Sequence, residues 1–139
     1  MASARRKLLV VSIIIRDETP SGKEIGSFVL EDAPSTITLR DLIRLRVREE
    51  VVRFNASPQE RFNGLVRPLE AEELLNGYQV KPGKRIDWEK QAEAAVEAFG
   101  HNGFFVLVGD RQVEDLDQLL DLSEASDVSF VKLVPLAGG

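Results

Sequence analysis

The chain begins with hydrophobic runs of the kind that strands require. Residues 7–16 read KLLVVSIIIR, a run dense in β-branched side chains, and they predict a strand buried on at least one face. Residues 17–24 supply Asp, Pro, Ser and Gly, which predict a turn. Residues 25–32 return to strand composition, so the two runs together predict a β-hairpin.

A helix follows, because from Leu39 the apolar positions recur at three- and four-residue steps. Thr36 or Thr38 can cap its first turn through the side-chain oxygen. The apolar positions form a single stripe, made of Leu39, Leu42, Ile43, Val47 and Val51.

Three arginines occupy another face of this helix. Arg40, Arg44 and Arg48 follow one another at four-residue spacing, so they line up along its surface. One interpretation is a solvated face, since Asp41 and Glu49 are close in sequence. The other is a docking face for an acidic partner.

Residues 54–100 have a different composition, rich in Asn, Pro and Gly with short apolar pieces. Within this segment, residues 68–77 predict a short helix and residues 77–86 a strand or turn. Residues 87–100 predict a second helix, which Asp87 can cap and a glycine can close, namely Gly100.

The last part of the chain returns to strands. Residues 103–113 predict a hairpin with a Gly-Asp turn, residues 114–126 a short helical turn or loop, and residues 127–135 a final strand. The fold class is therefore α+β: two strands, a helix, an inserted segment, then strand, short strand, short helix and strand.

Composition narrows the chemistry. The net charge of -5 over 139 residues argues against a nucleic-acid partner. The absence of cysteine excludes disulfides, thiolate metal sites and cysteine nucleophiles, and a single histidine excludes a multi-histidine metal site. No run reaches the length that spans a membrane, and no cleavage site follows the first apolar run, so we expect a cytoplasmic protein.

No catalytic constellation or bound cofactor is indicated, and we expect a protein that is not an enzyme. The run GYQVKPGK lacks the spacing and the Ser/Thr of a phosphate-binding loop. The remaining candidate site is the pair of glycines at the end of the sequence, Gly138 and Gly139. Having no side chain, two glycines can enter a narrow channel in extended form and allow close approach to a terminal carboxylate.

The residues before this pair resemble ubiquitin. The sequence FVLVGDRQVEDLDQLLDLSEASDVSFVKLVPLAGG matches its pattern of strand, turn, Q-apolar-E-D, a leucine-containing turn, a final strand and L-x-G-G. The opening hairpin and helix follow the same order. The resemblance implies a ubiquitin-like β-grasp domain over residues 1–139. Residues 54–100 would be inserted between the main helix and the third strand, and residues 135–139 would form a flexible tail.

Functionally, the resemblance implies that an activating enzyme adenylates Gly139 with ATP. The chain then passes through a thioester to a conjugating enzyme and a target amine, and a deconjugating protease can remove it. Its size and inserted segment favour a modifier of a bacterial conjugation system.

The resemblance also assigns recognition residues. Pro135, Leu136 and Ala137 would be read by the activating enzyme; ubiquitin has arginines where Pro135 and Ala137 stand, so its own activating enzyme is not the expected partner. The remaining candidates are Leu107, Leu133 and Arg111, which form a partner patch or, for the two leucines, part of the core.

Two alternatives stay open. The ending PLAGG also resembles the sulfur carriers of molybdopterin and thiamine synthesis, which form a C-terminal thiocarboxylate for cofactor or tRNA thiolation. The other alternative is a non-covalent β-grasp interaction module.

Overall fold

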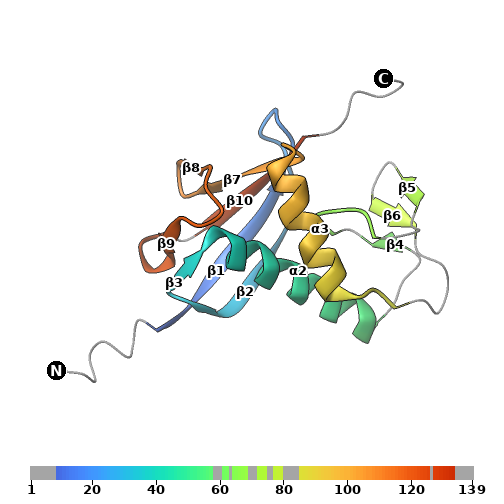
Figure 1. Ribbon diagram of the computed structural model, residues 1–139, viewed down its shortest axis with the longest axis horizontal. Helices are drawn as coiled ribbons and strands as arrows, with labels where there is room; N and C mark the ends of the chain where they lie inside the picture. The colour runs from blue at the N-terminus through green and yellow to red at the C-terminus, as the bar shows by residue number, and fades with distance from the viewer. Residues whose placement is uncertain are drawn as a thin grey trace. The chain divides into compact units, whose positions relative to one another are not determined.

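The computed structural model describes residues 9–57, 61–62, 64–68, 72–74, 77–79, 85–125 and 127–133. The chain divides into two compact units. The first comprises Met1–Leu42 and His101–Gly139, and the second comprises Ile43–Gly100. Helix α2 (Leu39–Ala56) begins in the first unit and continues in the second (Figure 1).

The β-hairpin predicted for the first two apolar runs is confirmed in the first unit. β1 (Val10–Glu18) and β2 (Glu24–Pro34) pair antiparallel. β-Branched side chains fill β1, and these suit a pleated, packed surface. In the turn, Thr19 N–H donates to Lys23 O at 2.9 Å. Gly22 adopts a φ of 89°, which a residue without a Cβ reaches without strain.

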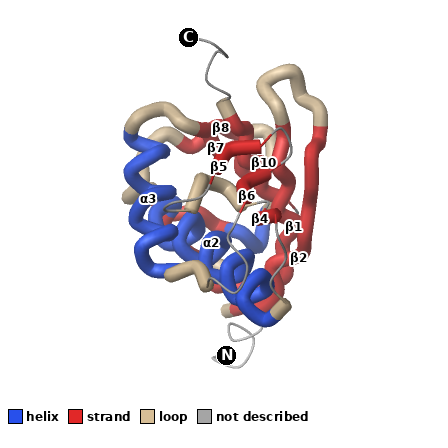
Figure 2. Tube along the Cα trace, turned by 90° about the vertical axis from the view of Figure 1, so that its right-hand side faces the viewer, coloured by secondary structure: helices blue, strands red, loops and turns tan. Residues whose placement is uncertain are grey.

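Five strands form one mixed sheet in the order β2-β1-β10-β7-β8. The remaining members are β7 (Phe104–Val108), β8 (Arg111–Val113) and β10 (Asp127–Lys132). β10 runs parallel to β1, whereas the other neighbouring pairs are antiparallel. β10 therefore lies in the middle of the sheet although it comes last among the described strands (Figure 2).

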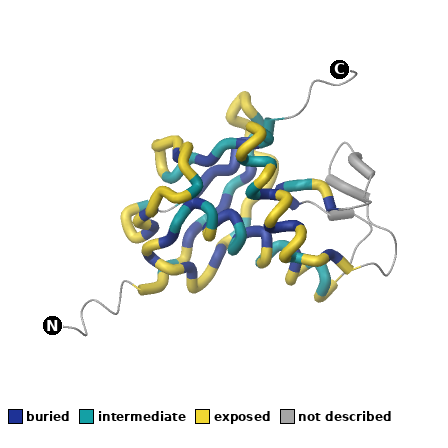
Figure 3. Tube along the Cα trace, viewed as in Figure 1, coloured by how far each residue is buried: buried dark blue, intermediate teal, exposed yellow. Residues whose placement is uncertain are grey.

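The two faces of this sheet are buried to different degrees. On one face, Ile15 pairs with Val128 and Val106 pairs with Phe130, and all four side chains are fully buried. Buried positions are dark blue in Figure 3. The Phe130 ring lies 5.9 Å from that of Phe104, measured between centroids, in a tilted arrangement. Burial of these apolar side chains is the main stabilising term of the unit. Several residues that alternate with them on the other face remain partly exposed.

Two short strands in the first unit were absent from the sequence prediction. β3 (Thr36–Thr38) pairs with β9 (Leu119–Asp121), and the 3-10 helix η1 (Leu122–Glu124) follows. The prediction of a short helical turn or loop over residues 114–126 is right for η1 but misses β9. A three-residue strand depends on a partner far along the chain, which local composition does not reveal.

The first turn of α2 is held by side-chain and backbone acceptors. Thr38 Oγ1 accepts a hydrogen bond from Asp41 N–H at 3.2 Å, which confirms Thr38 as a cap. Leu39 N–H donates to Gln118 O at 3.1 Å. The predicted apolar stripe is also confirmed, because its members are all fully buried: Leu39, Leu42, Ile43, Val47 and Val51.

The second unit contains a three-stranded sheet in the order β4-β6-β5. β4 (Arg61–Phe62) and β5 (Glu72–Leu74) both pair antiparallel with β6 (Gly77–Gln79). The short helix predicted over residues 68–77 is wrong, because β5 and β6 form a hairpin there. The helix propensity of the Glu and Leu residues is overridden here by the pairing of two short strands, which local composition does not reveal.

Side chains of α2 anchor both ends of the segment that joins it to the next helix. Asn55 Nδ2 donates to Ile86 O at 2.9 Å, and Ile86 N–H donates back to Asn55 Oδ1 at 3.0 Å. Near the other end, Glu50 Oε1 accepts from Leu65 N–H at 3.0 Å. These bonds satisfy backbone groups that would otherwise be costly to bury.

Glu50 also neutralises a buried cation. The Arg46 side chain is 1% exposed, and its Nε and Nη2 lie 3.3 and 3.1 Å from Glu50 Oε2. A buried guanidinium is costly unless it is paired and hydrogen-bonded. One carboxylate therefore links a charge inside α2 to the backbone of the following segment.

The second helix of the unit, α3 (Trp88–Gly100), begins as predicted. Asp87 Oδ1 accepts from Glu89 N–H at 3.0 Å, which confirms the N-cap. The helix ends at Gly100, as predicted, and the left-handed residue beyond it is Asn102, with a φ of 60°. Asparagine tolerates this conformation because its short side chain can hydrogen-bond locally.

Candidate functional site

The predicted reactive end of the chain lies outside the described residues. It comprises Pro135, Leu136, Ala137, Gly138 and Gly139. The structure does describe the strand that precedes these positions, because β10 ends at Lys132 and Leu133 comes next. We call Lys132 and Leu133 the tail root.

The backbone at the tail root is held by the strand on either side of β10. On one side, Lys132 pairs with Phe104, and Leu133 N–H donates to Gly103 O at 3.1 Å. On the other side, pairing with β1 extends to Val131. The residues that follow Leu133 therefore start from a fixed point at the end of a central strand.

Lys132 of the tail root forms an ion pair on the buried face of the sheet. Lys132 Nζ is 3.9 Å from Asp17 Oδ2, and the two side chains are 23% and 12% exposed. In the parallel pairing of β1 with β10, Asp17 stands opposite the fully buried Phe130. At such depth the attraction between the two charges is stronger than on an open surface.

The other face of the sheet carries a second charged group. Arg16 Nη1 donates to Glu24 Oε1 at 2.8 Å, and Arg16 Nε donates to Asp127 Oδ2 at 3.1 Å. The hydrogen bond to Glu24, followed by that to Asp127, raises the pKa of Arg16 above its ordinary value. The guanidinium thus stays charged and joins β1, β2 and β10.

The predicted partner patch of Leu107, Leu133 and Arg111 is only partly brought together. Leu107 is half-buried and pairs with Ser129 across β7 and β10. Leu133 continues the alternation of β10 on the same face, about 13 Å further along at the usual rise per residue. Arg111 stands opposite Val108, so the alternation of β8 places it on the other face from Leu107.

Two residues that sequence reasoning missed lie between the two leucines. Phe105 is half-buried and forms a cross-strand pair with Val131, which is 4% exposed. Phe105, Leu107 and Val131 form what we call the β7–β10 patch. The alternation within GFFVLV could have indicated Phe105, but assigning Val131 requires the register between β7 and β10.

The part of the chain that the structure describes holds no group of three or more His, Asp or Glu side chains able to bind a metal ion. Among its helices, none is long and apolar enough to cross a membrane. No protein-family model, curated protein or solved structure matches this chain.

Proposed function

We propose that the five-stranded sheet is a ubiquitin-like β-grasp and that the chain is a protein modifier. The observation that supports this most is the strand order β2-β1-β10-β7-β8 with β1 and β10 parallel. In this order the first and last strands lie side by side, and the chain after β10 leaves from the end of a central strand. Residues 54–100 are then an insertion before β7.

In the proposed reaction, a carboxylate oxygen of Gly139 attacks the α-phosphorus of ATP on an activating enzyme, and pyrophosphate leaves. A cysteine thiol of that enzyme displaces AMP to form a thioester, which passes by thiol exchange to a conjugating enzyme. A target amine then displaces the thiol and forms an amide bond. The cysteines belong to the partners, because this sequence contains none.

The end of the sequence suits this chemistry. Gly138 and Gly139 have no Cβ, so an extended chain can enter a narrow active-site channel. Where the natural chain continues past Gly139, cleavage after that residue exposes the same carboxylate. We propose that a dedicated activating enzyme recognises the chain through Pro135, Leu136 and Ala137.

The β7–β10 patch supports a docking role for the sheet. Phe105 and Leu107 offer apolar surface that is not fully covered, on a strand next to the one that leads to the tail root. Aromatic side chains are enriched at the centres of protein interfaces. The proposed partners are the activating enzyme, the conjugating enzyme, a deconjugating protease and the protein target.

A second candidate is a sulfur carrier, favoured by the ending PLAGG. Its first step is the same adenylation of Gly139. A sulfur donor then displaces AMP and leaves a thiocarboxylate instead of an amide bond. Intact-mass measurement after expression with the neighbouring genes separates the two: the carrier exchanges one oxygen for sulfur, whereas the modifier becomes linked to another protein.

Exchange of labelled pyrophosphate into ATP tests the step that both candidates share. The activating enzyme is enriched from an extract of the source organism on the immobilised chain. We expect exchange with the parent chain and with Gly26→Ala, a strand glycine with open space at the Cβ position. Exchange should disappear with Gly139→Val, since the added side chain blocks the channel. Persistent exchange with Gly139→Val would contradict the proposal.

A further inference from the structure

The arginines of α2 fall into two groups according to their partners. Three of them form ion pairs with carboxylates: Arg40 with Asp117, Arg46 with Glu50, and Arg53 with Glu49. Arg44 and Arg48 form no ion pair with any described carboxylate. Their guanidinium groups instead lie over the same indole ring, that of Trp88.

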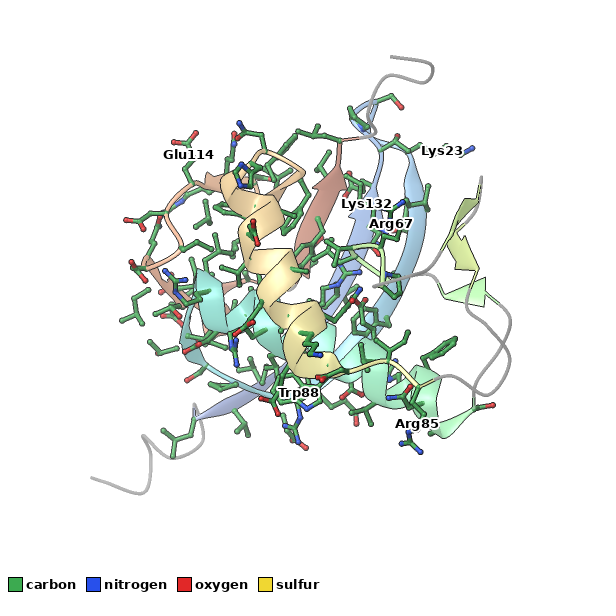
Figure 4. All side chains as sticks on the ribbon, turned by 45° about the vertical axis from the view of Figure 1, so that its right-hand side comes forward. Lys23, Arg67, Arg85, Trp88, Glu114 and Lys132 are labelled. Carbon is green, nitrogen blue, oxygen red and sulfur yellow. The ribbon has the colours of Figure 1, made fainter. Side chains whose placement is uncertain are left out.

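The three side chains belong to one compact unit and form a cluster at the start of α3. The Cζ atom of Arg44 is 5.9 Å from the centroid of the Trp88 ring, and that of Arg48 is 5.6 Å from it. Trp88 is half-buried, and Figure 4 shows it at the first turn of α3. We call Arg44, Arg48 and Trp88 the Trp88 cluster.

A cation–π contact with an indole leaves the hydrogen-bonding capacity of a guanidinium intact. The attraction to the ring acts through its face, whereas the N–H donors of arginine point outward in the guanidinium plane. Arg48 is exposed and Arg44 is half-buried. The contact with Trp88 thus orders both side chains and leaves donors for a further partner.

The placement of these charges carries a local cost. Like charges four residues apart destabilise a helix, and no described carboxylate forms an ion pair with Arg44 or Arg48. The chain as a whole has 23 acidic and 18 basic residues, so an excess of basic residues does not explain two arginines that form no ion pair with a described carboxylate. Asp87 Oδ1 accepts from the amides of Glu89 and Lys90, and Asp87 forms no ion pair with either arginine.

We propose that the Trp88 cluster is a docking surface for a carboxylate-rich peptide segment of a partner protein. A guanidinium matches a carboxylate through two parallel N–H···O bonds. Residues four apart on a helix are separated by about 6 Å along its axis. Alternate side chains of an extended peptide repeat at nearly the same spacing, about 7 Å. The indole adds apolar contact area, and Trp and Arg often dominate interface energies.

A short acidic peptide fits this surface better than a nucleic acid does. The net charge of the chain is -5, so a long polyanion meets repulsion over the rest of the protein. A peptide of a few residues interacts within one screening length, about 10 Å at moderate salt, where Arg44 and Arg48 dominate. This surface is independent of Gly139, so its test does not depend on the proposed conjugation.

The sequence provides a specific reporter, because Trp88 is its one tryptophan. Titration of the full chain with hexaglutamate should change the tryptophan emission in a saturable manner, and added salt should weaken binding. Hexaglutamine, the uncharged control, should leave the emission unchanged. Arg44→Gln combined with Arg48→Gln should weaken hexaglutamate binding at least about tenfold, since charge-assisted hydrogen bonds are lost. Arg53→Gln, on the same helix, should bind as the parent does.

If the double glutamine variant loses stability, a charge-reversal variant still tests the proposal. Arg44→Glu combined with Arg48→Glu should lose hexaglutamate binding and gain hexalysine binding, which an unfolded protein would not show; circular dichroism checks the fold. The proposal is overturned by unchanged emission with hexaglutamate, by equal binding in the neutral variant, or by failure to gain hexalysine binding. Tighter binding of oligothymidylate than of hexaglutamate through the same arginines would also overturn it.

Discussion

Lys132 Nζ lies 3.9 Å from Asp17 Oδ2 and thereby joins the first strand of the sheet to the last residue of β10. Both residues lie on the buried face, where β1 and β10 run parallel. The pair acts at the point where the chain leaves the sheet. It therefore stabilises the geometry on which a reactive tail would depend.

Replacing Asp17 by alanine should lower the free energy of unfolding by about 1–3 kcal/mol, because a largely buried cation loses a carboxylate partner. Urea denaturation measures the change. Glu114→Ala is the control, since Glu114 is exposed and should change stability by less than about 0.5 kcal/mol. Equal effects of the two substitutions would show that the ion pair adds nothing.

Adjacent glutamates on α2 provide a second matched comparison. Glu50→Ala should destabilise the protein by about 3 kcal/mol, because Arg46 is left buried without this partner and Leu65 N–H loses its acceptor. Glu49→Ala breaks an exposed pair with Arg53 and should cost less than about 0.5 kcal/mol. Thermal and urea unfolding measure both variants. A cost for Glu50→Ala as small as that for Glu49→Ala is not compatible with the buried pair described here.

Substitutions at two glycines distinguish backbone strain from steric crowding as the cause of destabilisation. A Cβ at Gly109 or at Gly100 would meet no atom within 4 Å, but only Gly109 has a positive φ, of 60°. Gly109→Ala should therefore destabilise the protein by about 1 kcal/mol, because alanine is strained in this conformation. Gly100→Ala, at the end of α3, should be neutral or slightly stabilising. Calorimetric melting compares them, and the same sign for both would refute a conformational origin.

If the β7–β10 patch is a docking surface, a substitution in it should lower conjugation without unfolding the protein. Leu107→Ser should lower the yield of ATP-dependent conjugates about tenfold in an extract of the source organism, by removing apolar contact with the partners. Leu119→Ser is the control, since Leu119 is exposed on β9 and outside the patch. Both variants should melt cooperatively. Equal conjugate yields would remove the patch from the docking surface.

Local patterns were sufficient for the strands and helices whose signals lie within a few residues. The sequence predicts the whole apolar stripe of α2 and the Asp87 cap, and it offers Thr38 as one of two caps for α2. The pairing of β3 with β9 was not, because residues 36–38 and 119–121 are distant in sequence. The sequence predicts a short helix where β5 and β6 pair, because the helix propensity of residues 68–77 carries no information on strand pairing.

The residues near the tail root could be predicted less completely from the sequence. Leu107 was identified, but Phe105 and Val131 depend on the register of β7 against β10. Arg111 was grouped with Leu107, although alternation in β8 turns it to the other face. The contact of Arg44 and Arg48 with Trp88 joins two helices separated by a long segment, and only the folded chain reveals it.

The central claim is that the carboxylate of Gly139 becomes covalently attached to another protein. The most direct measurement is mass spectrometry of proteins purified under denaturing conditions from the source organism expressing an N-terminally tagged chain. We predict branched peptides in which Gly139 is joined by an amide bond to a lysine of a target, and their absence with Gly139→Val. A parent chain recovered without any amide bond at Gly139, in cells that retain ATP, would contradict the account, and a thiocarboxylate there would favour the sulfur carrier instead.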